Sequence, residues 1–84
     1  MHRTTPDFWR LFEQLPGAAQ RTARRNFERL KESPRHPSLR FKKVGKFWSA
    51  RVGRSYRALA VEDEADFIWV WIGTHADYDR MIGT

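Results

Sequence analysis

The stretch FWSARVGRSYRALAV, residues 47–61, decides the fold, because it contains two strand-like segments separated by a short turn. In the first segment, residues 47–52, apolar side chains recur at every second position, which is the period of a half-buried β-strand. The second segment, residues 56–61, follows a turn at 53–55, where Gly53 can adopt the positive φ angle of a hairpin loop. We therefore predict an antiparallel β-hairpin in the middle of the chain.

The length of the hairpin loop determines which side chains share a face of the sheet. With three loop residues, Arg51 pairs with Arg57, and directly paired residues point to the same face. Two adjacent guanidinium groups repel each other unless an anion lies between them, so this register predicts an anion site. A two-residue loop would instead pair Arg57 with Ala50 and would separate the two arginines.

Two further segments extend the hairpin into a sheet. The first, LRFKKV at residues 39–44, precedes the hairpin and alternates imperfectly between apolar and polar side chains. The second, FIWVWI at residues 67–72, is apolar on both faces, which is typical of a central strand. These segments and the hairpin predict about four antiparallel strands.

The end of the last strand is the predicted functional position. If this strand runs antiparallel to its neighbour, Gly73 lies close to Arg57 and His75 leaves the sheet beside Arg51 and Arg57. Because Gly73 has no side chain, the backbone of a ligand could approach closely there. The alternative is a surface histidine that caps the last helix, with Tyr78 packing back on the sheet.

Two helices are predicted before the sheet. In TPDFWRLFEQL, residues 5–15, Thr5 can cap the helix and Pro6 suits its first turn. The apolar side chains of this segment follow the spacing of one helical face: Phe8, Leu11, Phe12 and Leu15. Pro-Gly at residues 16–17 ends this helix, and a second helix should run from about residue 18 to residue 31. So short a break predicts an antiparallel helical hairpin.

Together these elements predict an α+β fold, in which an N-terminal α-helical hairpin packs on a roughly four-stranded antiparallel sheet, followed by a short C-terminal helix. A chain of 84 residues predicts a single domain, residues 1–84. The absence of cysteine excludes disulfide and thiolate chemistry and is typical of a cytoplasmic protein. No apolar run has the length of a signal peptide or a membrane span, so no membrane partner is expected.

The charge distribution predicts a polyanionic partner. The formal net charge is +6, and no acidic residue occurs from residue 33 to residue 61. The basic residues of that span are Arg35, Arg40, Lys42, Lys43, Lys46, Arg51, Arg54 and Arg57. A field of one sign over so much of the chain attracts a polyanion, although a solubilising surface is equally compatible with charge alone.

Several motifs, taken in order, resemble those of a known family. They are a proline-rich loop at residues 33–39, Leu-x-x-Lys at 39–42, Arg-Val-Gly at 51–53, Tyr-Arg at 56–57 and Ile-Gly-x-His at 72–75. Their order and spacing resemble the RelE/ParE superfamily of bacterial toxins, and the resemblance extends from Leu11 to Tyr78. This superfamily includes the RelE, HigB and YafQ mRNA interferases and the gyrase-directed ParE proteins.

The resemblance implies a microbial RNase-like fold with a concave active surface on the sheet face opposite to the helices. It also implies cleavage of mRNA on the ribosome with the RNA 2′-hydroxyl as nucleophile, without a metal ion or cofactor. In this family Arg57 corresponds to the arginine that contacts the scissile phosphate, Arg51 to a basic residue of the preceding strand and His75 to a candidate general acid. Tyr78 falls near an aromatic residue that stacks on a base. The other candidates for RNA binding are Lys42, Lys43, Lys46 and Arg54.

The chain also departs from the family pattern. RelE has lysines on the strand that here reads FWSA, residues 47–50, where this chain has Trp48 and Ala50. The general base is therefore not assigned to a residue. Many relatives begin with an additional strand, and no such strand is predicted before the first helix of this chain.

The remaining histidine and tryptophan side chains are weaker candidates for functional residues. His2 is expected in a frayed terminus, and His36 in a loop that flanks the site. The tryptophans of the strands can stack on bases or pack in the core, and their alternating positions favour the core for Trp48, Trp69 and Trp71. In the family an antitoxin wraps the helical side, so Trp9 is a candidate interface anchor.

Three functions follow from these predictions. The leading hypothesis is the toxin of a type II toxin–antitoxin pair, a ribosome-dependent mRNA endonuclease whose partners are mRNA and a cognate antitoxin wrapping the helical hairpin and the active face. The second is a ParE-like inhibitor of DNA gyrase that performs no chemistry. The third is a basic nucleic-acid-binding relative without activity, because a fold alone does not determine function.

Overall fold

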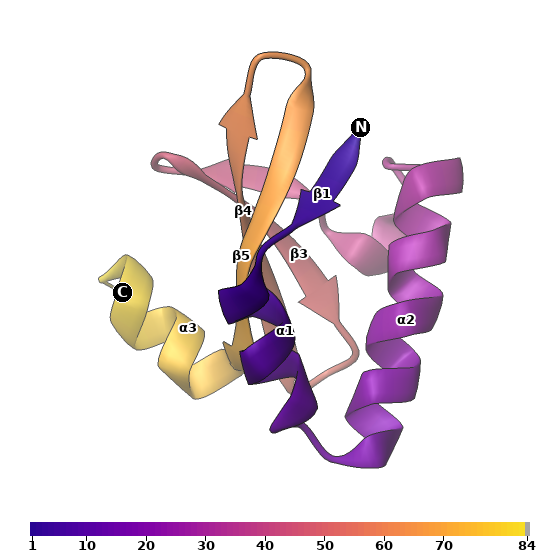
Figure 1. The fold of residues 1–84 in the computed structure, drawn as a ribbon, viewed down its shortest axis with the longest axis vertical. Coiled ribbons are helices and arrows are strands. Elements are labelled where there is room, and N and C mark those ends of the chain that lie inside the picture. The colour runs from indigo at the N-terminus through magenta and orange to yellow at the C-terminus, as the bar shows by residue number, and fades with distance from the viewer. Residues whose placement is uncertain (84) are drawn as a thin grey trace.

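The computed structural model describes residues 1–83. The helices and strands, in chain order, are β1 (His2–Thr4), α1 (Pro6–Glu13), α2 (Gly17–Glu32), the 3-10 helix η1 (Pro37–Leu39), β2 (Lys42–Val44), β3 (Phe47–Val52), β4 (Tyr56–Asp63), β5 (Asp66–Thr74) and α3 (His75–Ile82). The strands form a five-stranded sheet in the order β1-β5-β4-β3-β2 (Figure 1). The predicted α+β class is confirmed. No helix in the described part of the chain is long and apolar enough to cross a membrane.

The central hairpin has the predicted three-residue loop. Val52 of β3 pairs with Tyr56 of β4, and Gly53 in the loop has a φ angle of 63°, which favours glycine. Arg51 consequently pairs with Arg57, so both side chains leave the sheet on the same face. The two-residue alternative, which would have separated these arginines, is excluded by this register.

The N-terminus contains a strand that the sequence analysis did not predict. β1 runs parallel to β5, with His2 opposite Phe67, and the Phe67 N–H donates a hydrogen bond to the Met1 carbonyl (2.8 Å). The sheet therefore has five strands rather than about four, and the expected fraying of the terminus is wrong. Three residues carry too short a pattern to indicate a strand, and their partners lie more than sixty residues away. Since β5 lies between β1 and β4, the prediction that it is central is confirmed.

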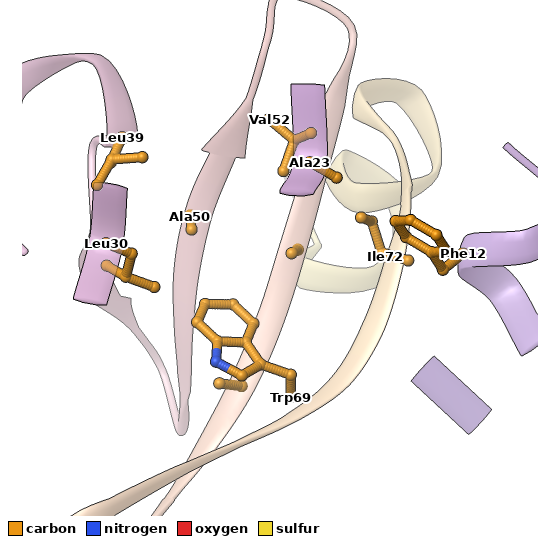
Figure 2. Packing of buried hydrophobic residues seen from close by; sticks show 10 residues of the cluster. Phe12, Ala23, Leu30, Leu39, Ala50, Val52, Trp69 and Ile72 are labelled. Atoms are coloured by element: carbon orange, nitrogen blue, oxygen red, sulfur yellow. The ribbon is translucent and has the colours of Figure 1, made fainter. Parts of the chain in front are cut away.

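The two N-terminal helices pack on one face of the sheet at separate strands. α1 begins as predicted, because the Thr5 hydroxyl accepts a hydrogen bond from the Phe8 N–H (3.2 Å) and Pro6 follows the cap. After a short turn α2 diverges from α1, so that α1 lies against β5 and α2 against β3 (Figure 1). The buried cluster between helices and sheet, seen in Figure 2, consists of Phe12, Ala23, Leu30, Leu39, Ala50, Val52, Ala58, Ala60, Trp69 and Ile72.

An irregularity in the pairing of β4 with β5 decides which tryptophans enter this core. Leu59 pairs with Trp71, but the next residue of β4 pairs with Trp69, so residue 70 is an extra residue in β5. Trp69 is 3% exposed in the core below the helices, whereas Trp71 projects from the opposite face. Regular alternation would have placed both side chains in the core, and this prediction is wrong for Trp71.

His2 provides a contact that depends on pH. Its Nδ1 accepts a hydrogen bond from the Trp69 indole N–H (3.0 Å), and its ring stacks on that of Phe67 with 5.5 Å between centroids. Burial lowers the pKa of His2 below its ordinary value of 6.5, and the N-terminal amine and Lys31 lower it further. The folded state therefore favours the neutral form of the His2 imidazole.

We expect the free energy of unfolding to decrease as the pH falls below about 6.5, because protonated His2 is more favourable in the unfolded chain. The stabilisation is fully present above the unfolded-state pKa and is lost progressively as the pH falls toward the lowered folded-state value. Urea unfolding on both sides of this range measures the effect. In His2→Asn the amide oxygen still accepts from Trp69 but does not titrate, so part of the pH dependence should disappear. An unchanged pH dependence in this variant would contradict the assignment.

Candidate functional site

A pocket of about 320 Å³ lies where the strands meet α3, on the sheet face that α1 and α2 leave uncovered. Figure 1 shows α3 and α2 on opposite sides of the sheet. The pocket is lined by Arg40, Lys42, Ser49, Arg51, Arg57, His75, Tyr78, Asp79 and Ile82. Four of these side chains are cationic and one is a carboxylate, so the pocket favours an anion.

The paired arginines form the middle of the pocket. Each donates a hydrogen bond to a backbone carbonyl: Arg51 Nε to Gly53 (3.0 Å) and Arg57 Nη1 to Tyr56 (2.9 Å). Within residues 1–83, neither guanidinium lies within 4.0 Å of a carboxylate oxygen. Burial lowers the pKa of Arg57, and repulsion by the Arg51 charge lowers it further. An anion bound between the two side chains would relieve this repulsion.

His75 is positioned by the junction between β5 and α3. The Thr74 hydroxyl caps α3 by accepting from the Asp77 N–H (3.1 Å), and the His75 N–H donates to the Ser55 carbonyl (2.8 Å). The imidazole Nδ1 lies 3.0 Å from a carboxylate oxygen of Asp79, one helical turn further on. This contact leaves Nε2 as the ring nitrogen that can face a ligand. The residue that caps the helix is Thr74, so the alternative of a capping histidine does not apply.

The pocket includes some of the predicted RNA-binding residues and omits others. Lys42 and Tyr78 line it. Three other candidates do not, namely Lys43, Lys46 and Arg54. Lys43 pairs with Trp48 and so projects from the other face of the sheet. Tyr78 is 6% exposed, and its ring lies edge-on to that of His75 with 6.0 Å between centroids, so it supports the imidazole and offers little surface to a base.

Four lining residues were not among the predicted site residues: Arg40, Ser49, Asp79 and Ile82. Asp79 stands four positions after His75, and the i, i+4 spacing on a helix was the available signal for it. Ser49 and Arg40 carried no such signal. His36, which was expected to flank the site, instead caps η1, where its Nδ1 accepts from a backbone N–H. Among residues 1–83, no group of three or more His, Asp or Glu side chains is arranged to hold a metal ion.

Gly73 has a role different from the predicted one. A Cβ atom at this position would lie 2.6 Å from the Cζ2 atom of Trp71, because the indole covers the glycine. The space above Gly73 is therefore filled by the protein's own side chain, and the expected approach of a ligand backbone at this residue is wrong. Gly73 still pairs with Arg57, as predicted, so Trp71 covers the strand beside the arginine pair.

The fold and the pocket define a small α+β protein with α1 and α2 on one sheet face and a cationic pocket bordered by α3 on the other (Figure 1). The chain belongs to the ParE-like toxin domain family, because the family model of that description matches residues 17–80. The matched residues contain α2, all antiparallel strands and every lining residue of the pocket except Ile82. The resemblance to the RelE/ParE superfamily is thereby confirmed. A search of curated protein sequences finds no match.

Solved structures share this fold at low sequence identity. The RelB–RelE antitoxin–toxin complex of Methanococcus jannaschii is 18% identical, with a TM-score of 0.72 over 93% of this chain and 96% of that chain. The RelBE2 toxin–antitoxin complex of Mycobacterium tuberculosis is 20% identical, with a TM-score of 0.67 over 89% and 96%. The isolated RelE toxin of E. coli is 10% identical, with a TM-score of 0.64 over 99% and 95%.

Proposed function

We propose that this protein, a single domain of residues 1–84, is the toxin of a type II toxin–antitoxin pair and cleaves mRNA on the ribosome in the cytoplasm. The observation that carries the proposal is one pocket containing the Arg51–Arg57 pair and the His75 imidazole. Binding a polyanion would need only the cations. An imidazole held by a carboxylate beside those cations adds a group that can transfer a proton.

The residues have distinct roles in the proposed reaction. The RNA 2′-hydroxyl gives its proton to water as its oxygen attacks the adjacent phosphorus. The bond to the 5′-oxygen breaks, which leaves a cyclic phosphate and a 5′-hydroxyl. Arg57 and Arg51 stabilise the additional charge of the transition state, because guanidinium donors match two phosphate oxygens. His75 Nε2 gives its proton to the departing 5′-oxygen, while Asp79 orients the ring.

A second candidate is a ParE-like inhibitor of DNA gyrase that binds without chemistry. The description of the matching family favours it, because that description refers to ParE. The cationic pocket is compatible with this function, but the contact between His75 and Asp79 would then have no chemical role. The composition of the pocket therefore favours the nuclease.

Two assays on the same protein preparation separate the candidates. In a reconstituted translation system, we expect mRNA to be cut within the ribosome-occupied region, and naked mRNA to be cut much more slowly. In a gyrase supercoiling assay, we expect no inhibition at the same concentration. Inhibition of supercoiling together with intact mRNA would assign the ParE-like function and would overturn the nuclease proposal.

We further propose that a cognate antitoxin binds over the cleft between α1 and α2. Two of the similar structures are complexes of a toxin with its antitoxin. In this chain an apolar cavity of about 390 Å³ lies between these helices and the sheet, with Phe8, Phe12 and Phe27 in its wall. Trp9 at its rim is 38% exposed, and the Arg24 guanidinium lies 5.8 Å from the centre of its ring. An apolar side chain flanked by a carboxylate would fit this cavity.

Trp9→Ala is expected to weaken binding of the antitoxin by at least about tenfold, because large exposed aromatic residues at a cavity act as interface anchors. Calorimetric titration with the cognate antitoxin measures the change. Met81→Ala is the matched control, because Met81 is also an exposed apolar side chain (51%) but lies on α3. Unchanged affinity in a folded Trp9→Ala variant would place the antitoxin elsewhere.

A further inference from the structure

Ser49 is a buried polar residue whose side chain lines the pocket. It is 2% exposed, lies on the same face of β3 as Arg51, and pairs with Lys42 on one side and Leu59 on the other. Its hydroxyl makes no hydrogen bond to any of residues 1–83. No fully enclosed side-chain oxygen or nitrogen of these residues lacks a partner, so the Ser49 hydroxyl is reached from the pocket.

A hydroxyl at this position is not required for packing. The neighbouring buried positions of β3 and β4 that need a small side chain use alanine, at Ala50, Ala58 and Ala60. A buried hydroxyl without a hydrogen-bond partner is unfavourable unless a ligand supplies the partner. Alanine in place of Ser49 would avoid this cost. The hydroxyl can both donate and accept a hydrogen bond, as an oxygen of a phosphate group requires.

One cation of the pocket, Lys42, lies directly beside this hydroxyl, and another, Arg40, lies closer to Arg57. Lys42 is the direct cross-strand partner of Ser49, so both side chains leave the sheet on the same face. Arg40 follows η1 in the left-handed conformation (φ 45°), lines the same pocket, and its charge contributes to lowering the pKa of Arg57. Neither Arg40 nor Lys42 forms an ion pair with a carboxylate of the described residues.

Ser49 and Lys42 lie beside the arginine pair along β3. Ser49 and Arg51 are alternate residues of one strand, so their Cα atoms are roughly 7 Å apart. The Arg51–Arg57 pair and His75 lie at the hairpin end of the pocket, whereas Ser49 lies two residues further along β3 with Lys42 paired to it on β2. A polyanionic chain lying along β3 would therefore present one charged group to the arginine pair and the next to Ser49 and Lys42.

We propose that Ser49 and Lys42 form a second phosphate subsite, which holds the phosphodiester next to the one that is cleaved. This inference rests on the proposed function, because it takes RNA as the ligand. The Ser49 hydroxyl donates a hydrogen bond to a phosphate oxygen, and Lys42 balances the charge of that phosphate. The subsite takes no part in chemistry and sets the register of the RNA across the arginine pair.

The test compares two 2′-O-methyl oligonucleotides, which cannot be cleaved: a dinucleotide with one phosphodiester and a trinucleotide with two. Dissociation constants come from NMR titration of the intact protein. The wild type should bind the trinucleotide more tightly, and Ser49→Ala should lose this advantage, binding the trinucleotide roughly tenfold more weakly while its dinucleotide affinity stays unchanged. Ser33→Ala, outside the pocket after α2, is the matched control and should bind as the wild type does.

The outcomes separate the subsite from the proposed function. If Ser49→Ala keeps the full trinucleotide advantage, the subsite is wrong while RNA binding at the arginine pair stands. If the wild type binds neither oligonucleotide, both the subsite and the proposed RNA ligand are overturned. A third titration uses inorganic phosphate. If phosphate binds in a Ser49-dependent way while the trinucleotide has no advantage, the site takes a free anion and the inference also fails.

Discussion

Arg57→Ala should reduce ribosome-dependent mRNA cleavage by about 10²–10³-fold and abolish growth arrest on expression. Arg57 is paired with Arg51 in the pocket and makes its hydrogen bond to a backbone carbonyl, so its charge is available to a phosphate. Removing the guanidinium removes donors that act on charge developing in the transition state, and kcat should fall more than KM rises. Single-turnover cleavage on programmed ribosomes measures the change.

Two variants control this prediction. Arg54→Ala removes the same charge from the hairpin loop, outside the pocket, and should stay within a few-fold of wild type. Arg57→Lys keeps a charge but loses the planar fork, so its activity should fall between those of the wild type and the alanine variant. The protein should remain folded in all three, because Arg57 is not part of the buried cluster. A fully toxic Arg57→Ala protein would eliminate the nuclease proposal.

His75→Ala should lower the cleavage rate by about 10²–10⁴-fold, because the departing 5′-oxygen would no longer receive a proton from a positioned acid. The contact between Nδ1 and Asp79 and the backbone bond to Ser55 hold the imidazole at the edge of the arginine pair. His36→Ala is the matched control, because His36 is an exposed histidine that caps η1 outside the pocket. This control should cleave mRNA at the wild-type rate.

A chemical rescue distinguishes a general acid from a merely structural histidine. If sulfur replaces the 5′-oxygen at the scissile bond, the leaving group departs without needing a proton. The His75→Ala variant should then recover most of the wild-type rate, whereas Arg57→Ala should not, since its defect concerns the charge on the phosphate. Failure of the modified substrate to restore His75→Ala would exclude the acid role and leave His75 as a binding residue.

The local features of the site were predictable because they depend on short-range geometry. A three-residue loop with glycine at a positive φ angle is sufficient to place Arg51 opposite Arg57, and an antiparallel last strand brings Gly73 beside Arg57. The Thr5 cap is also local, because donor and acceptor are three residues apart. Turn chemistry and side-chain period are properties of neighbouring residues, so the sequence carries them directly.

Other parts of the site depend on contacts between distant segments. The extra residue in β5 moves Trp71 to the pocket side of the sheet, where it covers Gly73, and no local pattern marks that bulge. Ser49 is buried on the pocket face of the sheet, although its type is usually exposed. Lys43 and Lys42 look alike in the sequence, but the pairing of β2 with β3 sends them to opposite faces.

The sequence by itself determined the α+β class, the central hairpin, and the position of His75 at the end of the last strand. The structure then selected the hairpin register that pairs Arg51 with Arg57. The tertiary structure alone decided that β1 forms an edge of the sheet beside β5, and that Arg40, Ser49 and Asp79 line the pocket. The physical reason is the sequence separation between the residues that fix each feature. Backbone periodicity and turns are fixed within a few residues, whereas the composition of a pocket depends on which distant segments bury surface against each other.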